Sequence, residues 1–152
     1  MENNNPRVLI IEDHDVLRVM LFTILRHQPL QVDTAASADA AMKKVETCDY
    51  ALVLIDMGLE NSTAEPFLTR FRQARPEATT FIIAVCDPTK NVQVDPDIVS
   101  AVLNKPLEID TLAEVVRECA VVVPPPEDPL PCQSPAESDV RAAFDRGSTI
   151  AN

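Results

Sequence analysis

The stretch Ala51-Leu52-Val53-Leu54-Ile55-Asp56 is an uninterrupted apolar run that ends in a carboxylate. Two further runs follow the same plan: Val8-Leu9-Ile10-Ile11 leads into Glu12-Asp13, and Ala101-Val102-Leu103 is closely followed by Lys105. Short apolar runs separated by helix-like segments are typical of a parallel sheet covered on both faces. Because open α/β sheets bind ligands at the carboxyl ends of their strands, we expect the three acids and the lysine to converge there.

The rest of the chain alternates between strand-like and helix-like segments. Strands are expected at 8–11, 30–35, 50–55, 81–85 and 101–103, and helices at 15–27, 38–47, 64–74 and 108–120. Asp15 and Ser37 are the expected caps of the first two helices. Between Cys86 and Leu103, two prolines bracket a polar stretch without an apolar stripe, so a fourth helix there should be short or irregular. The pattern predicts an α/β fold, a doubly wound five-stranded parallel sheet flanked by helices.

The expected domain covers residues 1–123, because Pro124-Pro125-Pro126 cannot continue a helix. Proline and acidic residues dominate 124–136, which predicts an extended, disordered linker. In the tail, 137–152, residues 138–146 have the composition of one or two helical turns, too short to be stable alone. A disordered tail is the favoured expectation; the alternatives are a short helix that docks on a partner or on the domain, or a remnant of a longer chain.

Composition excludes several classes of function. The net charge is −11 and no Lys/Arg cluster is present, which argues against direct binding to nucleic acid. The polar start of the chain does not resemble a signal peptide, and no run approaches the roughly 20 apolar residues of a membrane span, so we expect no membrane insertion. The cysteines are scattered without a C-x-x-C pair, which predicts reduced thiols in a cytoplasmic protein and no metal site among them; they are Cys48, Cys86, Cys119 and Cys132.

The acids carry the expected chemistry. Glu12, Asp13 and Asp56 would lie within a few ångströms of one another, where each close pair repels by roughly 4 kcal/mol at an effective dielectric of about 20. Such a cluster requires a cation, and oxygen ligands favour Mg²⁺. Lys105 would then pair with a phosphoryl oxygen, and Asp56 would be the nucleophile. The alternative is that these residues are merely solvated side chains at strand ends. Because all four stand at matching strand ends, this alternative is the less favoured one.

The ordered set of Glu12-Asp13, Asp56 and Lys105-Pro106 resembles the receiver domain of two-component response regulators, in its single-domain, chemotaxis-regulator-like form. The resemblance covers residues 7–122 and implies a flavodoxin-like fold. It implies that Asp56 takes a phosphoryl group from a histidine kinase or a phosphotransfer protein. It also implies that Glu12 and Asp13 hold Mg²⁺, directly or through water, together with the backbone carbonyl of Gly58, and that Lys105 contacts the phosphoryl group.

Several positions depart from the family pattern. Cys86 stands where the family carries the Ser or Thr whose hydroxyl reports phosphorylation, and a thiol is a weaker, bulkier donor. Asp87 replaces the small residue that usually follows, and Val102 lies where an aromatic switch residue is usual. Glu60 and Ala64 occupy the family's proline and glycine positions. We therefore expect the phosphoryl chemistry to be kept and its readout to be altered, with Cys86 a buried substitute for Thr rather than a redox sensor.

Three functions are compatible with the sequence. The favoured one is a phosphorylatable receiver that signals to a downstream protein partner through contacts, with a homodimer as a further expectation. The second is a degenerate receiver that acts as a phosphorylation-independent interaction module, which the unusual residues at Cys86, Asp87 and Val102 would suit. The third is a phosphatase of similar topology with an aspartyl nucleophile, but Gly58 stands where that chemistry needs a general acid.

Overall fold

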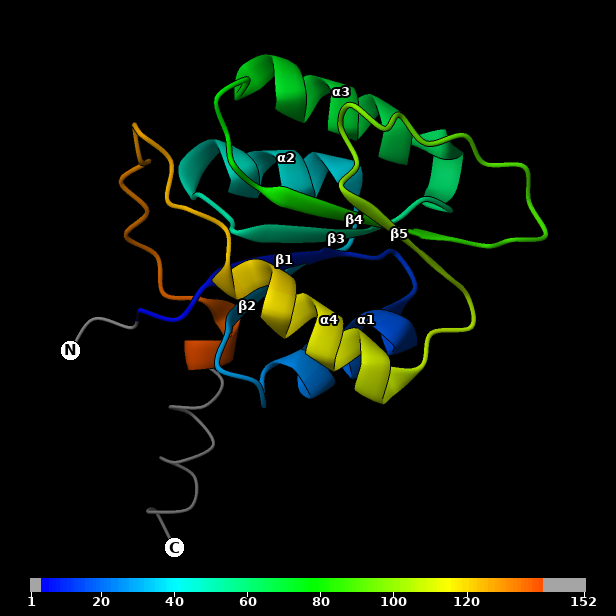
Figure 1. Cartoon of the computed structure of the whole chain (residues 1–152), viewed down its shortest axis with the longest axis horizontal. Helices are drawn as coiled ribbons and strands as arrows, with labels where there is room; N and C mark the ends of the chain where they lie inside the picture. Colours follow the sequence, from blue (N-terminus) through cyan, green and yellow to red (C-terminus); the bar gives the residue numbers. More distant parts are fainter. Residues whose placement is uncertain (1–3, 141–152) are drawn as a thin grey trace, which may run out of the picture.

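A five-stranded parallel sheet forms the centre of the molecule (Figure 1). The computed structural model describes residues 4–140. The strands lie in the order β2-β1-β3-β4-β5, which confirms the predicted doubly wound α/β class. Their bounds are β1 Arg7–Ile11, β2 Gln31–Ala35, β3 Leu52–Asp56, β4 Phe81–Cys86 and β5 Ala101–Asn104.

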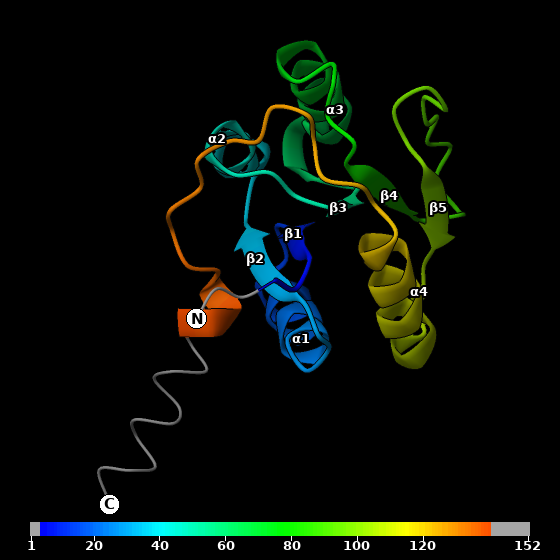
Figure 2. The same cartoon turned by 60° about the vertical axis from the view of Figure 1, so that its left-hand side comes forward.

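Two helices cover each face of the sheet (Figure 2). The helices α2 (Ala38–Thr47) and α3 (Ala64–Ala74) lie on one face, and α1 (Asp15–Leu25) and α4 (Ile109–Val121) lie on the other. Neighbouring residues of a strand point to opposite faces, so in β1 Leu9 packs toward α2 and α3 while Val8 packs toward α1 and α4. Both faces of the sheet are buried, which explains why the central strands β1 and β3 are apolar except at Arg7 and Asp56, at the ends of the strands.

Polar side chains cap the first two helices. In α2, Ser37 Oγ accepts a hydrogen bond from the Ala40 N–H at 3.1 Å, so the expected cap is confirmed. In α1 the expectation is wrong by one residue, because His14 Nδ1 accepts the bond from the Leu17 N–H at 3.3 Å. Asp15 is instead the first helical residue, where its negative charge suits the helix dipole.

The segment between β4 and β5 is irregular, as predicted. Within the described residues, 87–100 contain turns and bends but no helix. Pro88 and Pro96 remove backbone donors, and apolar side chains in between pack against the core singly rather than as a helical stripe. At the neighbouring sheet edge Val102 remains 47% exposed.

The segment that follows α4 lies against the domain. Thr79 Oγ1 donates to the Pro124 carbonyl at 2.7 Å, and the Leu130 N–H donates to Asp49 Oδ2 at 2.7 Å. Residues 137–140 are helical. Polar and backbone contacts thus hold this segment, which the composition predicts to be a disordered linker, against the domain in the structure. The remainder of the expected helical turns, 141–146, lies outside the described residues.

Two of the four cysteines form a disulfide. Cys48, at the end of α2, is bonded to Cys132 in the docked segment, 84 residues away. The expectation of four reduced thiols is therefore wrong for this pair, whereas Cys86 and Cys119 are free. Sequence spacing did not reveal the pair because the two sulfurs meet only when the segment lies on the domain.

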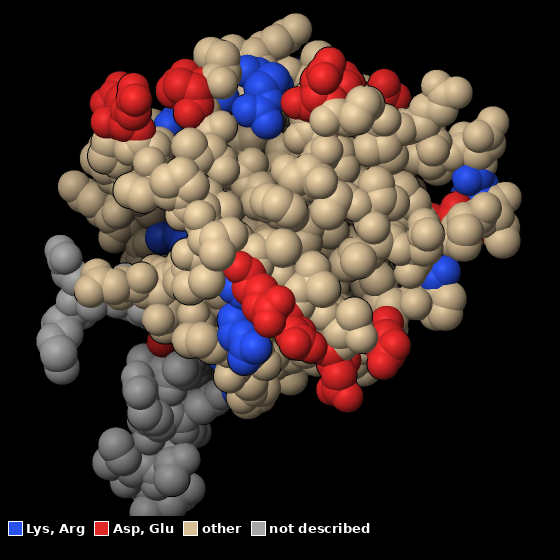
Figure 3. Space-filling model, viewed as in Figure 1, with Lys and Arg blue, Asp and Glu red and all other residues tan. Residues whose placement is uncertain are grey.

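Acidic side chains are prominent on the surface. A line of them crosses the face shown in Figure 3, over α4, where Asp110, Glu114 and Glu118 are exposed. Among the described residues, every helix is too short or too polar to cross a lipid bilayer.

Candidate functional site

The candidate site lies at the carboxyl ends of four strands. Glu12 follows β1, Asp56 ends β3, Cys86 ends β4 and Lys105 follows β5. Parallel pairing aligns these ends, with Ile11 opposite Ile55 and Asp56 opposite Val85. Their proximity is thus a consequence of strand register, as the apolar runs predicted.

Three carboxylates meet at this edge. Glu12, Asp13 and Asp56 each offer an oxygen atom, and these atoms all lie within 4.8 Å of one another. Glu12 is 2% exposed and Asp56 is 7% exposed, while Asp13 is half-buried. This donor set fits a hard divalent cation such as Mg²⁺, which binds oxygen ligands and keeps some of its waters.

Backbone N–H groups orient the acids. The Gly58 N–H donates to Asp56 Oδ1 at 2.8 Å, and the Glu60 N–H donates to Asp13 Oδ2 at 2.9 Å. A Cβ atom at Gly58 would lie 3.2 Å from Asp56 Oδ1, closer than side chains usually approach. Glycine at this position therefore keeps space around the Asp56 carboxylate.

Lys105 pairs directly with Asp56. Its Nζ lies 2.9 Å from Asp56 Oδ2, and its backbone N–H donates to the Cys86 carbonyl at 2.8 Å. Burial by itself would raise the pKa of Asp56, but the Gly58 N–H and Lys105 outweigh it and leave that pKa below its ordinary value. Burial likewise works to lower the pKa of Lys105, and the bond to Asp56 more than reverses this. The pair is therefore ionised.

The pKa of Glu12 is shifted in the opposite direction from that of Asp56. Burial, followed by the hydrogen bond and the negative charge of Asp56, raises the pKa of Glu12 to about 7. Below pH 7 and without a cation, Glu12 is mostly protonated and hydrogen-bonds to Asp56. A divalent cation at the three acids would take the place of that proton, which is the behaviour expected of a metal site built from close carboxylates.

Cys86 is a buried thiol beside the acids. Burial and the charge of Asp56 raise its pKa, so the sulfur stays protonated and poorly reactive. The adjacent Asp87 turns back on its own loop, where its Oδ1 accepts bonds from Thr89 Oγ1 at 2.6 Å and from the Thr89 N–H at 2.9 Å. Burial and the raised pKa of the thiol speak against Cys86 as a redox sensor.

Sequence reasoning missed the supporting contacts that Arg18 and Glu60 make. Arg18 of α1 donates to the Glu12 carbonyl at 3.1 Å, and it pairs with Asp15 at 2.7 Å. Glu60 holds Asp13 through its backbone, which no side-chain pattern can reveal. The structure does bring together the four residues that the sequence predicted for the site, Glu12, Asp13, Asp56 and Lys105.

Comparison with known proteins identifies relatives over most of the chain. The family described as "Response regulator receiver domain" matches residues 8–117. The transcriptional regulatory protein PmrA of Pectobacterium parmentieri is 28% identical over 81 residues, which are 53% of this chain and 36% of that protein. The transcriptional regulatory protein BasR of Escherichia coli (strain K12) matches with the same identity and coverage. The chain thus spans only about a third of the length of these curated relatives.

Solved structures share the fold. The chemotaxis response regulator CheY4 of Vibrio cholerae superposes with a TM-score of 0.67 at 21% identity, over 76% of this chain and 99% of that one. The response regulator TrrA of Thermotoga maritima, solved in complex with Mg²⁺ and BeF, gives a TM-score of 0.65 at 21% identity, over 75% and 98% of the two chains. At these identities the likeness establishes the fold alone.

Proposed function

Because the chain belongs to the response regulator receiver domain family, we propose that Asp56 accepts a phosphoryl group from a histidine kinase or a phosphotransfer protein. In this proposal Mg²⁺ is held by Glu12, Asp13 and Asp56 together with the backbone carbonyl of Gly58. The observation that carries the proposal is the convergence of three carboxylates within 4.8 Å, one of them paired with Lys105.

The residues divide the work of transfer. An Asp56 carboxylate oxygen attacks the phosphorus, the P–N bond to the donor histidine breaks, and that nitrogen takes up a proton from solvent. The depressed pKa of Asp56 keeps the nucleophile ionised. Lys105, already 2.9 Å from the carboxylate, moves its charge to the incoming phosphoryl oxygens. When bound, Mg²⁺ neutralises the acids and the phosphoryl charge.

The readout of phosphorylation differs from the family pattern in this proposal. Cys86 provides only a weak donor at the position next to the phosphoryl group. Val102 provides no ring that can reorient at β5. Signalling therefore proceeds through a protein partner that reads a surface other than the usual switch, in the cytoplasm, without direct contact to nucleic acid. A homodimer is a further form that this readout could take.

The proposal is tested by intact mass. The protein is incubated with Mg²⁺ and acetyl phosphate beside two variants, Asp56→Asn and the exposed-site control Asp110→Asn. We expect one phosphoryl adduct on the wild type and on Asp110→Asn, none on Asp56→Asn, and none on any of them with EDTA. A folded wild type that gains no adduct from an active donor would refute the proposal and leave the interaction-module function.

A further inference from the structure

The outer edge of β2 is covered by the C-terminal segment of the chain. β2 is an edge strand, and such strands expose N–H groups that can pair with other chains. Here the Val32 N–H donates to Ser138 Oγ at 2.9 Å, and the Thr34 N–H donates to Glu137 Oε1 at 3.2 Å. Side chains of the segment thus occupy the donors that a further strand would use.

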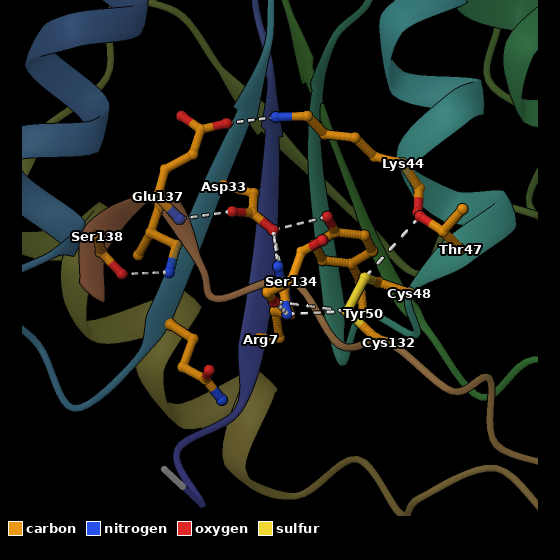
Figure 4. A network of polar contacts seen from close by, with 12 residues as sticks. Arg7, Asp33, Lys44, Thr47, Cys48, Tyr50, Cys132, Ser134, Glu137 and Ser138 are labelled. Atoms are coloured by element: carbon orange, nitrogen blue, oxygen red, sulfur yellow. Dashed lines mark hydrogen bonds and ion pairs between the residues drawn. A yellow bond between two sulfur atoms is a disulfide. The ribbon is translucent and has the colours of Figure 1, made fainter. Parts of the chain in front are cut away.

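The buried acid Asp33 holds the segment through the backbone of Glu137 (Figure 4). Asp33 is 3% exposed, and its Oδ1 accepts from the Glu137 N–H at 2.8 Å. Its Oδ2 is held by Arg7 at 2.8 Å and by the Tyr50 hydroxyl at 2.7 Å. Arg7 also donates to the Ser134 carbonyl at 2.9 Å. The network joins the sheet to two points of the segment.

Apolar burial and an ion pair complete the docking. Ala136 is fully buried, although composition placed it in a disordered linker. Lys44 of α2 forms an ion pair with Glu137 and also donates to the Thr34 carbonyl. The segment therefore has a built seat on the domain, formed by β2, the end of α2 and the Arg7–Asp33–Tyr50 network.

The disulfide closes this seat. Cys48 is buried at the end of α2, whereas Cys132 lies in the segment, partly open to solvent and in contact with the Arg7 guanidinium. Cys132 is therefore the half of the disulfide that is more open to attack by a small thiolate. Its attack forms a mixed disulfide with Cys132 and expels Cys48 as a thiolate; a second thiol then releases Cys132. Overall, two thiols are oxidised to one disulfide while Cys48 and Cys132 are reduced.

We propose that residues 130–140 are a redox-controlled cover of the β2 edge, closed while Cys48 and Cys132 are bonded and opened by thiol–disulfide exchange. Oxidation by a small disulfide, such as glutathione disulfide, restores the bond and returns two thiols. Opening exposes the Val32 and Thr34 donors and removes one of the donors to the buried Asp33. The device is separate from Asp56 and does not require that Asp56 be phosphorylated.

Amide hydrogen exchange on the full chain tests the proposal. The Val32 and Thr34 amides are followed by NMR in glutathione disulfide and in dithiothreitol, with Leu54 of the central strand as an internal control. We expect exchange at Val32 and Thr34 to be about tenfold faster or more after reduction, and exchange at Leu54 to stay within about twofold. Equal protection of the edge amides in both redox states would overturn the proposal.

Two variants separate the disulfide from general effects of the reductant. Cys132→Ser should exchange quickly at both edge amides under either condition, while Cys119→Ser should keep the redox response of the wild type. Thiol alkylation in denaturant should count two free thiols in the oxidised protein and four in the reduced one. The proposal would be overturned by four free thiols after equilibration with glutathione disulfide. It would also be overturned if Val32 and Thr34 were as protected in Cys132→Ser as in the oxidised wild type.

Discussion

Replacing Glu12 by glutamine is expected to stabilise the cation-free protein at neutral and alkaline pH. Glu12 is buried beside Asp56, and its pKa of about 7 means that folding opposes its ionisation. Glutamine has nearly the shape of the protonated acid and keeps a donor for Asp56. The variant therefore retains the contact while it removes the ionisable group.

The size of the effect follows from the two pKa values of Glu12. The folded-state value of about 7 lies above the ordinary value of 4.5. That gap corresponds to roughly 3 kcal/mol once the group is ionised in both states. Because the folded-state pKa is the raised one, this part of the stability is present below pH 4.5 and is lost as pH rises through 7. Glu12→Gln does not lose this stability. The difference in free energy of unfolding between the variant and the wild type should therefore grow by about 2–3 kcal/mol between pH 5 and pH 8, in favour of the variant.

Urea unfolding in EDTA, followed by circular dichroism, measures this difference. The chain has no tryptophan, so the far-ultraviolet signal is the suitable probe. Glu46→Gln, on the exposed side of α2, controls for the loss of a carboxylate as such. Saturating Mg²⁺ should stabilise the wild type more than Glu12→Gln, because it binds the ionised acid. A stability difference between wild type and Glu12→Gln that is the same at pH 5 and pH 8 would refute the reasoning.

Three further predictions concern the polar networks. Tyr50→Phe removes the 2.7 Å bond to Asp33 and should lower the free energy of unfolding by about 1.5–3 kcal/mol; no change in urea unfolding would contradict this. Lys105→Met should raise the pKa of Asp56 in a carbon-13 NMR titration, because the bonded cation that favours the carboxylate is gone; an unchanged pKa would show that the pair is weak. Mg²⁺ binding at pH 6 should release about one proton per ion, detected by calorimetry in two buffers of different ionisation enthalpy, and Glu12→Gln should release fewer. Equal release by both proteins would place the proton elsewhere.

The core of the fold was predictable because its signals are local. The run from Ala51 to Ile55 is apolar throughout since β3 is buried on both faces, and the same holds for Val8 to Ile11 of β1. Parallel strands place their carboxyl ends at one edge of the sheet, so the proximity of Glu12, Asp56 and Lys105 could be predicted from the sequence. The irregular segment before β5 was also readable, from its prolines. The cap of α1 was misplaced because His14 and Asp15 both offer a suitable acceptor and only backbone geometry distinguishes them.

The electrostatic state of the site needed the folded structure. The same residue type, a carboxylate, has a raised pKa at Glu12 and a lowered one at Asp56. The difference arises from donors that the sequence does not place: the Gly58 N–H and Lys105 lower the pKa of Asp56, whereas the single His14 N–H that donates to Glu12, at 3.3 Å, does not offset burial and the charge of Asp56. Distances of a few ångströms decide which acid is ionised.

The local sequence was thus sufficient for the sheet, its helices and the residues at its carboxyl edge, because each follows from a short run of side chains. The seat of the C-terminal segment was decided only by tertiary structure. Cys48 and Cys132 are separated by 84 residues, and Asp33 looks like an ordinary strand residue until Arg7, Tyr50 and Glu137 surround it. Contacts of this kind depend on how distant parts of the chain meet. Polar segments have no periodic pattern that indicates where they will bind.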